Sequence, residues 1–272
     1  VWRADRPQKG RYQEFTQCDA DVIGSKSILL EFEMLQLFSA VFKRLKLDDV
    51  KIRVNHRKVL NRIANFIGLK NDFNEFLVVL DKIDKIGIDK VKDELKSKFS
   101  ELKGLDKLFE LISKKMSPKI YLENLKDNYL NTDDNALLDE LETLVNLIND
   151  NNNLIDIDFD FSLVRGLEYY TGLIYEVSLD SESDVGSLGG GGRYENLTEA
   201  FNLRDNSGIG ISFGLDRIYH VIDDKNLFPK NISLNNDILV INFGKEYILK
   251  ISDLISELRS SGVNVSVYPD SN

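Results

Sequence analysis

A long helical stretch lies between two strand-rich segments of this chain, and that order restricts the folds it can adopt. From about residue 57 to residue 152, apolar residues recur with helical spacing, and the breaks fall at Gly68, Gly87, Gly104 and Pro118. The residues on either side alternate in polarity or form short apolar runs, which is typical of strands. Helices enclosed by strand-rich segments predict an α+β fold with an inserted helical subdomain.

The segments that flank this helical block predict the rest of the main domain. Residues 1–25 predict a strand, a turn and a second strand, and residues 27–47 predict a helix with one apolar face. Residues 50–54 predict a short strand, and Asn55 is the candidate cap of the helix that follows. Apolar residues alternate with aspartates over 155–161, which predicts a half-buried strand with a solvent-facing acidic row; a cation site is the alternative.

The last segment predicts a different kind of unit. Residues 237–243 form a continuously apolar run, residues 246–260 are helical, and residues 263–268 are again strand-like, so a β-α-β unit is expected. An apolar run without alternation predicts a parallel strand that is covered on both faces. The chain opens with Val1 rather than Met and ends at Asn272 before such a unit is complete, which suggests a fragment.

Composition narrows the class of protein. Hydrophobic residues make up 42% of the chain and charged residues 29%, as in ordinary globular proteins, and no apolar run has the length of a membrane span. The single cysteine, Cys18, cannot form an internal disulfide, which favours a cytoplasmic location, and two histidines are too few for a His-rich metal site. The net charge of −10 argues against a general nucleic-acid binder, but residues 81–119 carry a local net charge of +3. Either a solvated helical face or a contact with phosphates explains that local excess.

Four stretches place arginine among glycines and aromatic residues. They are WRADRPQKGRYQEF (2–15), LVRGLEYYTGLIYEV (163–177), LGGGGRYENL (188–197) and GIGISFGLDRI (208–218). The planar guanidinium suits carboxylates and phosphates, and tyrosines offer flat walls with polar tips. One such stretch alone is best explained as a strand edge with core aromatics, whereas four of them together indicate a ligand site.

Two of these stretches suggest how the site is built. Phe15, Gln17, Asp19 and Asp21 share one parity of an extended run, so they face either a ligand or solvent. Four consecutive glycines, 189–192, are costly in chain entropy, and either a backbone that crowds against a ligand or a flexible loop explains them. A helix is expected from about residue 195. Neither the P-loop pattern nor the dinucleotide fingerprint is present.

In series, the four stretches resemble histidyl-tRNA synthetase, a class II aminoacyl-tRNA synthetase. Residues 2–25 resemble motif 2 of that class, LVRGLEYYTG and LGGGGRYENL resemble the two signatures of the histidine enzyme, and GISFGLDR resembles motif 3. The resemblance covers nearly the whole chain. A counterpart of motif 1, with its dimer helix, would lie before Val1.

This resemblance implies an activity and its requirements. The family joins L-histidine to ATP, which gives histidyl-adenylate and pyrophosphate, and then transfers histidine to tRNA(His). ATP with Mg²⁺ is therefore the expected cofactor, L-histidine and tRNA(His) are the expected partners, and a cytoplasmic homodimer is expected for the full-length protein. Because negative charge builds up on the phosphates during activation, fixed arginines are the main catalytic tool.

By resemblance, three arginines are catalytic: Arg3 at the α-phosphate, Arg165 between the substrate carboxylate and that phosphate, and Arg217 at the far end of the triphosphate. The implied ATP-binding residues are Arg3, Asp5, Arg11, Phe15 and Arg217, with Phe15 stacked on adenine. The implied histidine-binding residues are Arg3, Gln17, Asp21, Arg165, Tyr169, Tyr170, Gly189, Gly190, Gly191 and Gly192. No residue is assigned to a metal. The chain has Asp5 where the family usually has Glu, and Glu168 where it usually has Asp.

The resemblance also implies a class II antiparallel sheet flanked by helices, and a division of the chain. Residues 1–56 and 153–230 would form the catalytic core, residues 57–152 an insertion domain that approaches the tRNA acceptor arm, and residues 237–272 the start of an anticodon-binding domain. Two non-catalytic relatives are alternatives: the regulatory subunit of ATP phosphoribosyltransferase and the RNA-sensing synthetase-like domain of certain kinases. The complete arginine set and the β-α-β pattern near the end favour the synthetase.

Overall fold

The computed structural model describes residues 1–4, 6–7, 11–114, 116–130, 134–166, 169–180, 185–195, 199, 202, 206–229, 237–268 and 270. The chain divides into two compact units, Val1–Asn226 and Leu227–Asn272, and each is described by itself.

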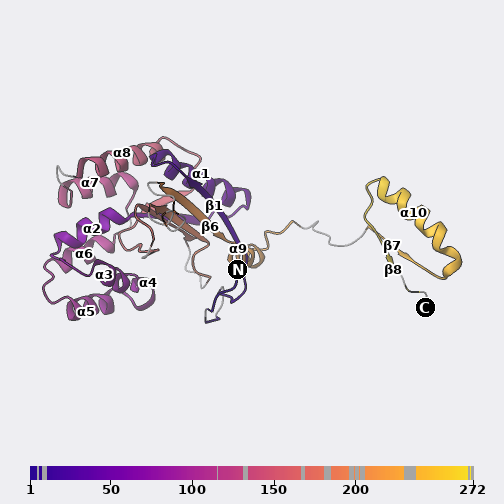
Figure 1. The fold of residues 1–272 in the computed structure, drawn as a ribbon, viewed down its shortest axis with the longest axis horizontal. Coiled ribbons are helices and arrows are strands. Elements are labelled where there is room, and N and C mark those ends of the chain that lie inside the picture. Colours follow the sequence, from indigo (N-terminus) through magenta and orange to yellow (C-terminus); the bar gives the residue numbers. More distant parts are fainter. Residues whose placement is uncertain are drawn as a thin grey trace. The chain divides into compact units, whose positions relative to one another are not determined.

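A mixed sheet forms the centre of the first unit. Among the described residues, its strands are β1 (Gln17–Ile23), β2 (Val50–His56), β3 (Asp156–Phe159), β4 (Leu173–Leu179), β5 (Gly189–Tyr194) and β6 (Gly208–Gly214). Their order is β1-β6-β5-β4-β2-β3, and Figure 1 labels the neighbouring strands β1 and β6. All neighbours are antiparallel except β2 and β3, which are parallel. The α+β class is confirmed, but the expectation of a wholly antiparallel sheet is wrong. The helical block joins β2 to β3, and a long crossover of that kind is what a parallel pair requires.

Helices surround this sheet, and most of them come from the helical block. The described helices of the first unit are α1 (Ile28–Arg44), α2 (Arg57–Phe66), α3 (Phe73–Leu80), α4 (Ile83–Ile86), α5 (Ile88–Lys98), α6 (Leu105–Ile112), α7 (Pro118–Asn128), α8 (Asn135–Asn149) and α9 (Leu215–Asp224). The expected breaks are confirmed: Gly68, Gly87 and Gly104 lie between helices with positive φ, which favours glycine. Pro118 begins α7, where its missing N–H costs nothing.

The cap between β2 and α2 differs from the expectation. Strand β2 runs on to His56, and His56 Nδ1 accepts a hydrogen bond from the backbone N–H of Lys58 at 3.0 Å. Asn55 is fully buried instead, and its side chain bonds the carbonyl of Leu163 and the hydroxyl of Tyr121. Those partners lie far along the chain, so tertiary contacts override the local capping preference of asparagine.

One face of the sheet packs on α1. The rings of Phe38 and Phe42 on this helix contact Phe213 of β6, with centroids 5.1 and 6.0 Å apart. Phe38 also lies directly over Gly189, where a Cβ would already be tight. All three rings are buried, and α8 lies beside α1 (Figure 1). This apolar layer leaves the opposite face of β5 and β6 for other contacts.

A buried ion pair ties α1 to the end of β5. Arg193 Nε and Nη2 each donate to one carboxylate oxygen of Glu31 at 2.5 Å, and both side chains are almost completely buried. Arg193 also bonds the backbone carbonyl of Ser25 and the hydroxyl of Ser207. This cluster of hydrogen bonds compensates for the cost of burying the two charges.

The aspartates of residues 155–161 do not form a uniform solvent-facing row. Asp156 is exposed and Asp158 is partly exposed, but Asp160 is buried, with only 6% of its surface accessible. Asp160 accepts a hydrogen bond from Arg53 Nε at 2.9 Å, so an arginine on the neighbouring strand offsets its charge. The expectation of a solvated acidic row was therefore wrong at this position.

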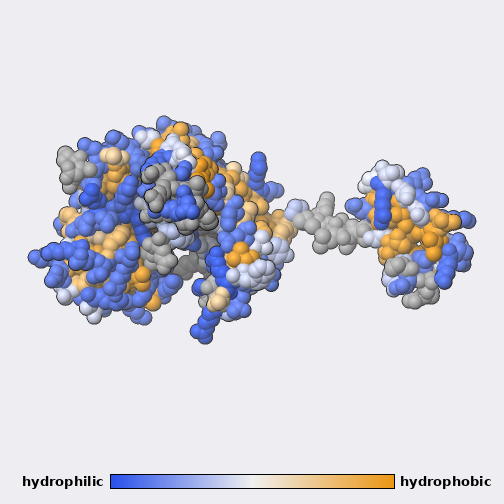
Figure 2. Space-filling model, viewed as in Figure 1, coloured by the Kyte–Doolittle hydropathy of each residue, from blue (hydrophilic) through white to orange (hydrophobic). Residues whose placement is uncertain are grey.

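The second unit contains β7 (Ile238–Ile241), a 3₁₀ turn η3 (Lys245–Tyr247), α10 (Ile248–Ser260) and β8 (Val265–Tyr268). Strands β7 and β8 are parallel, so the β-α-β expectation is confirmed. The expectation that β7 is covered on both faces is wrong for the described residues: Leu239 is 58% exposed and Ile241 is 50% exposed. Figure 2 shows hydrophobic residues gathered on one face of this unit. In the described part of the chain, no helix is both long and apolar enough to cross a membrane.

Candidate active site

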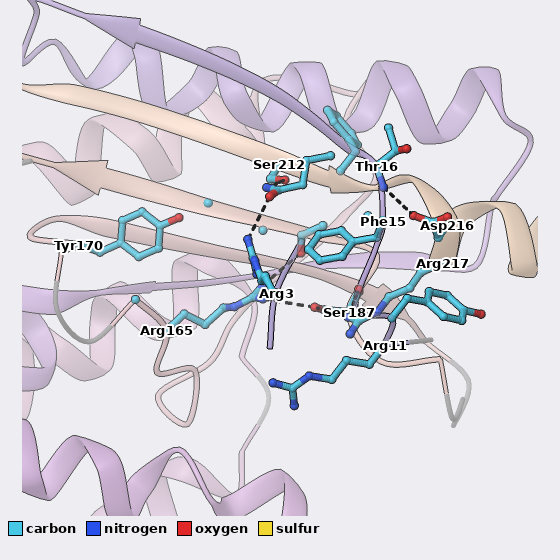
Figure 3. Close-up of a pocket in the computed structure, with 18 of the residues that line it drawn as sticks. Arg3, Arg11, Phe15, Thr16, Arg165, Tyr170, Ser187, Ser212, Asp216 and Arg217 are labelled. Carbon is cyan, nitrogen blue, oxygen red and sulfur yellow. Dashed lines mark hydrogen bonds between the residues drawn. The ribbon is translucent and has the colours of Figure 1, made fainter. Parts of the chain in front are cut away.

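A cavity of about 380 Å³ lies on the sheet face opposite α1. Its walls come from all four of the arginine-containing stretches (Figure 3). The lining residues are Arg3, Arg11, Tyr12, Phe15, Thr16, Gln17, Arg165, Gly166, Tyr169, Tyr170, Ser187, Gly189, Gly190, Gly191, Ser212, Phe213, Gly214, Asp216 and Arg217. This volume is within the usual range for a small-molecule site.

The floor of the cavity is the glycine strand β5. Gly189 to Gly192 form a regular strand between β4 and β6, so the flexible-loop alternative is wrong. A strand of glycines has no side-chain pattern to maintain, and here it makes room for others: a Cβ at Gly190 would overlap the guanidinium of Arg165. Cβ atoms at Gly191 and Gly192 would overlap the backbone carbonyls of Gly210 and Leu173, so the protein itself crowds these glycines, and crowding against a ligand stays a prediction.

Arg165 lies across this floor. Its Nη1 bonds the carbonyl of Gly189 at 3.2 Å and lies 3.2 Å from Oε2 of Glu176, and its Nη2 bonds the hydroxyl of Ser187 at 3.3 Å. About a third of the side chain is accessible. The guanidinium is thus held by three groups beneath it while part of it still faces the cavity.

Arg217 and Arg11 occupy the far end of the cavity from Tyr170 (Figure 3). Arg217, on the first turn of α9, donates from Nη1 to the carbonyl of Ser187 at 2.8 Å. Burial lowers the pKa of Arg217, and the positive charges of Arg165 and Arg11 lower it further. These arginines are therefore close enough to repel one another, and a bound anion would relieve that repulsion.

Described residues of the N-terminal stretch, 2–15, form another wall of the cavity. Trp2 pairs with Glu14, which brings Arg3 beside Phe15, with the Arg3 guanidinium carbon 4.9 Å from the ring centroid. Arg3 Nη2 also bonds Oε1 of Gln17 at 3.0 Å. Phe15 therefore presents a flat face next to a positive charge, an arrangement that suits a planar, negatively charged ligand.

The tyrosine end of the cavity is polar but not basic. Burial raises the pKa of Tyr170, and Tyr169 and Asp21 act in the same direction, so the Tyr170 hydroxyl keeps its proton at neutral pH. The hydroxyl of Tyr194 donates to Asp21 at 2.7 Å. Hydroxyls and a carboxylate can together donate to and accept from a small polar ring.

The comparisons with known proteins agree with this geometry. A family model described as histidyl-tRNA synthetase matches residues 1–218. The chain belongs to the histidyl-tRNA synthetase family. The histidine–tRNA ligase of Christiangramia forsetii is 44% identical over 273 residues, which cover 100% of this chain and 60% of the relative. That of Flavobacterium johnsoniae is 42% identical over 272 residues, which cover 99% and 57%. The chain thus spans about 60% of the length of these curated relatives.

Solved structures give the same family fold. The histidyl-tRNA synthetase of Nostoc sp. PCC 7120 matches with a TM-score of 0.76 at 26% identity, over 96% of this chain and 62% of that one. A Bacillus halodurans C protein, an ATP phosphoribosyltransferase regulatory subunit/histidyl-tRNA synthetase, has the same TM-score at 22% identity, over 98% and 65%. At that identity the second match shows the fold alone.

Most residues that the synthetase resemblance implied lie around one cavity. Those among the lining residues are Arg3, Arg11, Phe15, Gln17, Arg165, Tyr169, Tyr170, Gly189, Gly190, Gly191 and Arg217. Asp21 and Gly192 are not among them, although the ring of Tyr170 lies over Gly192. Asp5 and Glu168 lie outside the described residues, as does most of the helix expected from about residue 195. Arg193 and Tyr194 are the last two residues of strand β5.

The sequence analysis did not identify several residues that line the cavity. Ser187 contacts both Arg165 and Arg217, through its hydroxyl and its carbonyl. Asp216 accepts a hydrogen bond from the backbone N–H of Thr16 at 3.1 Å, which links α9 to the N-terminal stretch. Ser212 bonds the amide of Gln17 at 3.3 Å. Ser212 and Asp216 lie within the stretch GISFGLDR and Ser187 adjoins LGGGGRYENL, but a single serine or aspartate carries no periodic pattern.

Proposed function

We propose that this chain contains the adenylate-forming core of a histidine–tRNA ligase. The observation that carries the proposal is the convergence of Arg3, Arg11, Arg165 and Arg217 on one cavity of a chain whose net charge is −10. Such a local concentration of positive charge suits a polyanion such as a triphosphate. The family membership and the polar end of the cavity at Tyr169 and Tyr170 support histidine as the second substrate.

The proposed reaction is attack by the histidine carboxylate on the α-phosphorus of ATP. One carboxylate oxygen forms the new P–O bond, and the bond to the bridging oxygen breaks, so pyrophosphate leaves with that electron pair. In this proposal Arg165 bridges the carboxylate and the α-phosphate, Arg3 contacts the α-phosphate, and Arg11 and Arg217 hold the outer phosphates. Fixed cations aimed at the charge that develops lower the barrier without reorganisation. Phe15 beside Arg3 is the candidate platform for adenine.

Magnesium would enter with ATP in this proposal. Within the described residues there is no group of three or more histidine, cysteine, aspartate or glutamate side chains that could hold a metal ion. Among the described residues that line the cavity, Asp216 is the one carboxylate, so the donors for the ion would mainly be phosphate oxygens. Bound there, magnesium would neutralise phosphate charge, and the arginines would supply the rest.

Histidine-dependent exchange of pyrophosphate into ATP tests this proposal directly. The full-length gene product that carries these residues is expected to catalyse the exchange with histidine and with no other amino acid. A protein that folds but does not exchange would contradict the proposal and favour a regulatory, non-aminoacylating role.

Specificity for histidine is proposed to come from Gln17, Asp21, Tyr169 and Tyr170, with Gly189–Gly192 as the floor. Asp21→Ala should raise the KM for histidine roughly ten- to a hundredfold, because a charged hydrogen bond to the imidazole is lost. The KM for ATP measured on the same preparation should change less than about twofold. Tyr194→Phe, which removes only the hydroxyl that supports Asp21, should give a smaller effect of the same kind. Equal rises in both KM values would point to general damage.

We further propose that residues 57–152 are the insertion domain that meets the acceptor arm of tRNA(His), and that residues 237–272 begin the anticodon-binding domain. The local charge of +3 over residues 81–119 supports the first part. Its lysines differ, however: Lys92 pairs with Asp106 at 2.5 Å and Lys98 with Glu75 at 2.9 Å. Lys90 and Lys96 are exposed.

Changing Lys90, Lys92, Lys96 and Lys98 to Gln should therefore weaken aminoacylation several-fold and leave pyrophosphate exchange unchanged, since exchange needs no tRNA. The defect should shrink as salt rises, because each lost phosphate contact lowers the salt dependence of binding. Lys90 and Lys96 alone should account for most of it, because the other two already have acidic partners. Changing Lys43 and Lys46, exposed lysines at the end of α1, is the matched control. Unaltered aminoacylation at low salt would show that these lysines are only a solvated surface.

A further inference from the structure

Glu176 of β4 lies between two arginines that come from different parts of the fold. Its Oε2 is 3.2 Å from Nη1 of Arg165, and its Oε1 is 3.1 Å from Nη1 of Arg53. The Glu176 side chain is 17% accessible, and the Arg53 side chain is equally covered. One carboxylate therefore joins the cavity arginine to an arginine that does not line the cavity.

The strand register explains why Glu176 occupies this place. Glu176 pairs with Gly190 on one side and with Arg53 on the other, so all three positions face the same side of the sheet. Because Gly190 has no side chain, the guanidinium of Arg165 can lie on β5 and reach the next strand. Glu176 is the residue on β4 that it meets.

Arg53 is fixed more firmly than Arg165. Its Nε bonds Asp160 at 2.9 Å, its Nη2 bonds the hydroxyl of Ser162 at 2.9 Å, and its Nη1 also bonds Asp84 of α4 at 3.0 Å. Burial alone would lower the pKa of Arg53, but the charges of Asp160, Asp84 and Glu176 together raise it. Arg53 therefore stays charged and gives the Glu176 carboxylate a fixed positive partner.

We propose that Glu176 is a positioning residue for Arg165, and that Arg53 anchors Glu176 for this purpose. An arginine side chain loses considerable rotamer freedom when it is held in one place, and a carboxylate fixed on a central strand removes that freedom before substrate arrives. Because Arg53 shares the carboxylate, Glu176 neutralises only part of the charge on Arg165. This inference rests on the proposed function, in which Arg165 contacts the reacting groups.

The test uses Glu176→Gln in the full-length gene product. The exchange kcat is expected to fall about tenfold, the scale of one charged hydrogen bond, while the KM values for ATP and histidine stay within about twofold. Glu176→Asp keeps the charge and should retain more activity than Gln, and it supplies the comparison if the Gln variant does not fold. Asp158→Asn is the matched control, because Asp158 has a similar accessibility of 22% but pairs with Lys51, away from the cavity.

A second measurement separates positioning from general damage. In an Arg165→Ala background, Glu176→Gln should cause no further loss of exchange, because Glu176 acts only through Arg165. Wild-type kcat in Glu176→Gln, or the same tenfold loss when Arg165 is already absent, would overturn the inference. If the wild-type protein itself shows no exchange, the proposed function fails instead. Partial proteolysis and thermal unfolding of each variant verify that the fold is intact.

Discussion

Arg165→Ala in the full-length gene product is expected to slow histidine-dependent pyrophosphate exchange about a hundredfold or more. Removal of one preorganised charge donor at a reacting centre costs roughly this much. The structure gives the reason: Arg165 is held by Gly189, Ser187 and Glu176 on the floor of the cavity, so its charge is in place before substrates bind. The loss should appear mainly in kcat, because the fixed charge matters most when the α-phosphate and the carboxylate meet.

Arg165→Lys separates charge from shape. Lysine keeps the charge but lacks the planar fork, so it should recover only part of the activity. The unfolding midpoints of both Arg165 variants should match that of the wild type, since about a third of the Arg165 side chain is accessible and no core packing is lost. Exchange within about threefold of wild type for the alanine variant would mean that Arg165 is not the catalytic arginine.

Glu31→Gln is expected to lower the free energy of unfolding by about 3–5 kcal/mol, the typical cost of breaking a buried ion pair. Glutamine has nearly the same shape, so the loss would come from the uncompensated charge of Arg193 rather than from a cavity. Arg193 also carries the contacts to Ser25 and Ser207, so α1 and β5 should loosen together. Urea unfolding of the variant and the wild type measures the difference.

The matched control for this change is Glu33→Gln on the same helix, because Glu33 is exposed. That variant should stay within about 0.5 kcal/mol of wild type. Similar midpoints for Glu31→Gln and Glu33→Gln would show that the buried pair contributes little to stability.

Periodicity in the sequence was enough to predict the helices of the helical block and the β-α-β order at the end. Side-chain pattern is the physical basis of those predictions. The same reasoning fails for Gly189–Gly192, because residues without side chains have no pattern, and the strand became visible only through its neighbours. It fails for Asn55 as well, whose partners Tyr121 and Leu163 lie far away in sequence.

The arginines of the cavity were accessible to prediction because they stand within recognisable motifs. The groups that hold these arginines in place could not be predicted from the sequence. Ser187 holds Arg165 and Arg217 through one hydroxyl and one carbonyl, and nothing in its local sequence marks it. Arg193 and Glu31 are 162 residues apart, and only the fold shows that they pair. The motifs thus identify the arginines that line the cavity, whereas the groups that hold them depend on tertiary structure.

The parallel pairing of β2 with β3 limits how the first unit can be shortened. Lys51 is opposite Asp156 and Val54 is opposite Phe159, so the end of β2 at His56 and the start of β3 lie about five residues apart along the sheet, roughly 16 Å. A tight turn cannot bridge parallel strands, and a replacement for the helical block would need a crossover on the order of a dozen residues. The replacement crossover would also have to cover the buried side of β3. It would have to supply a donor for His56 Nδ1, which now bonds the backbone N–H of Lys58. To shorten the first unit is therefore a problem of designing a crossover, not of deleting a loop.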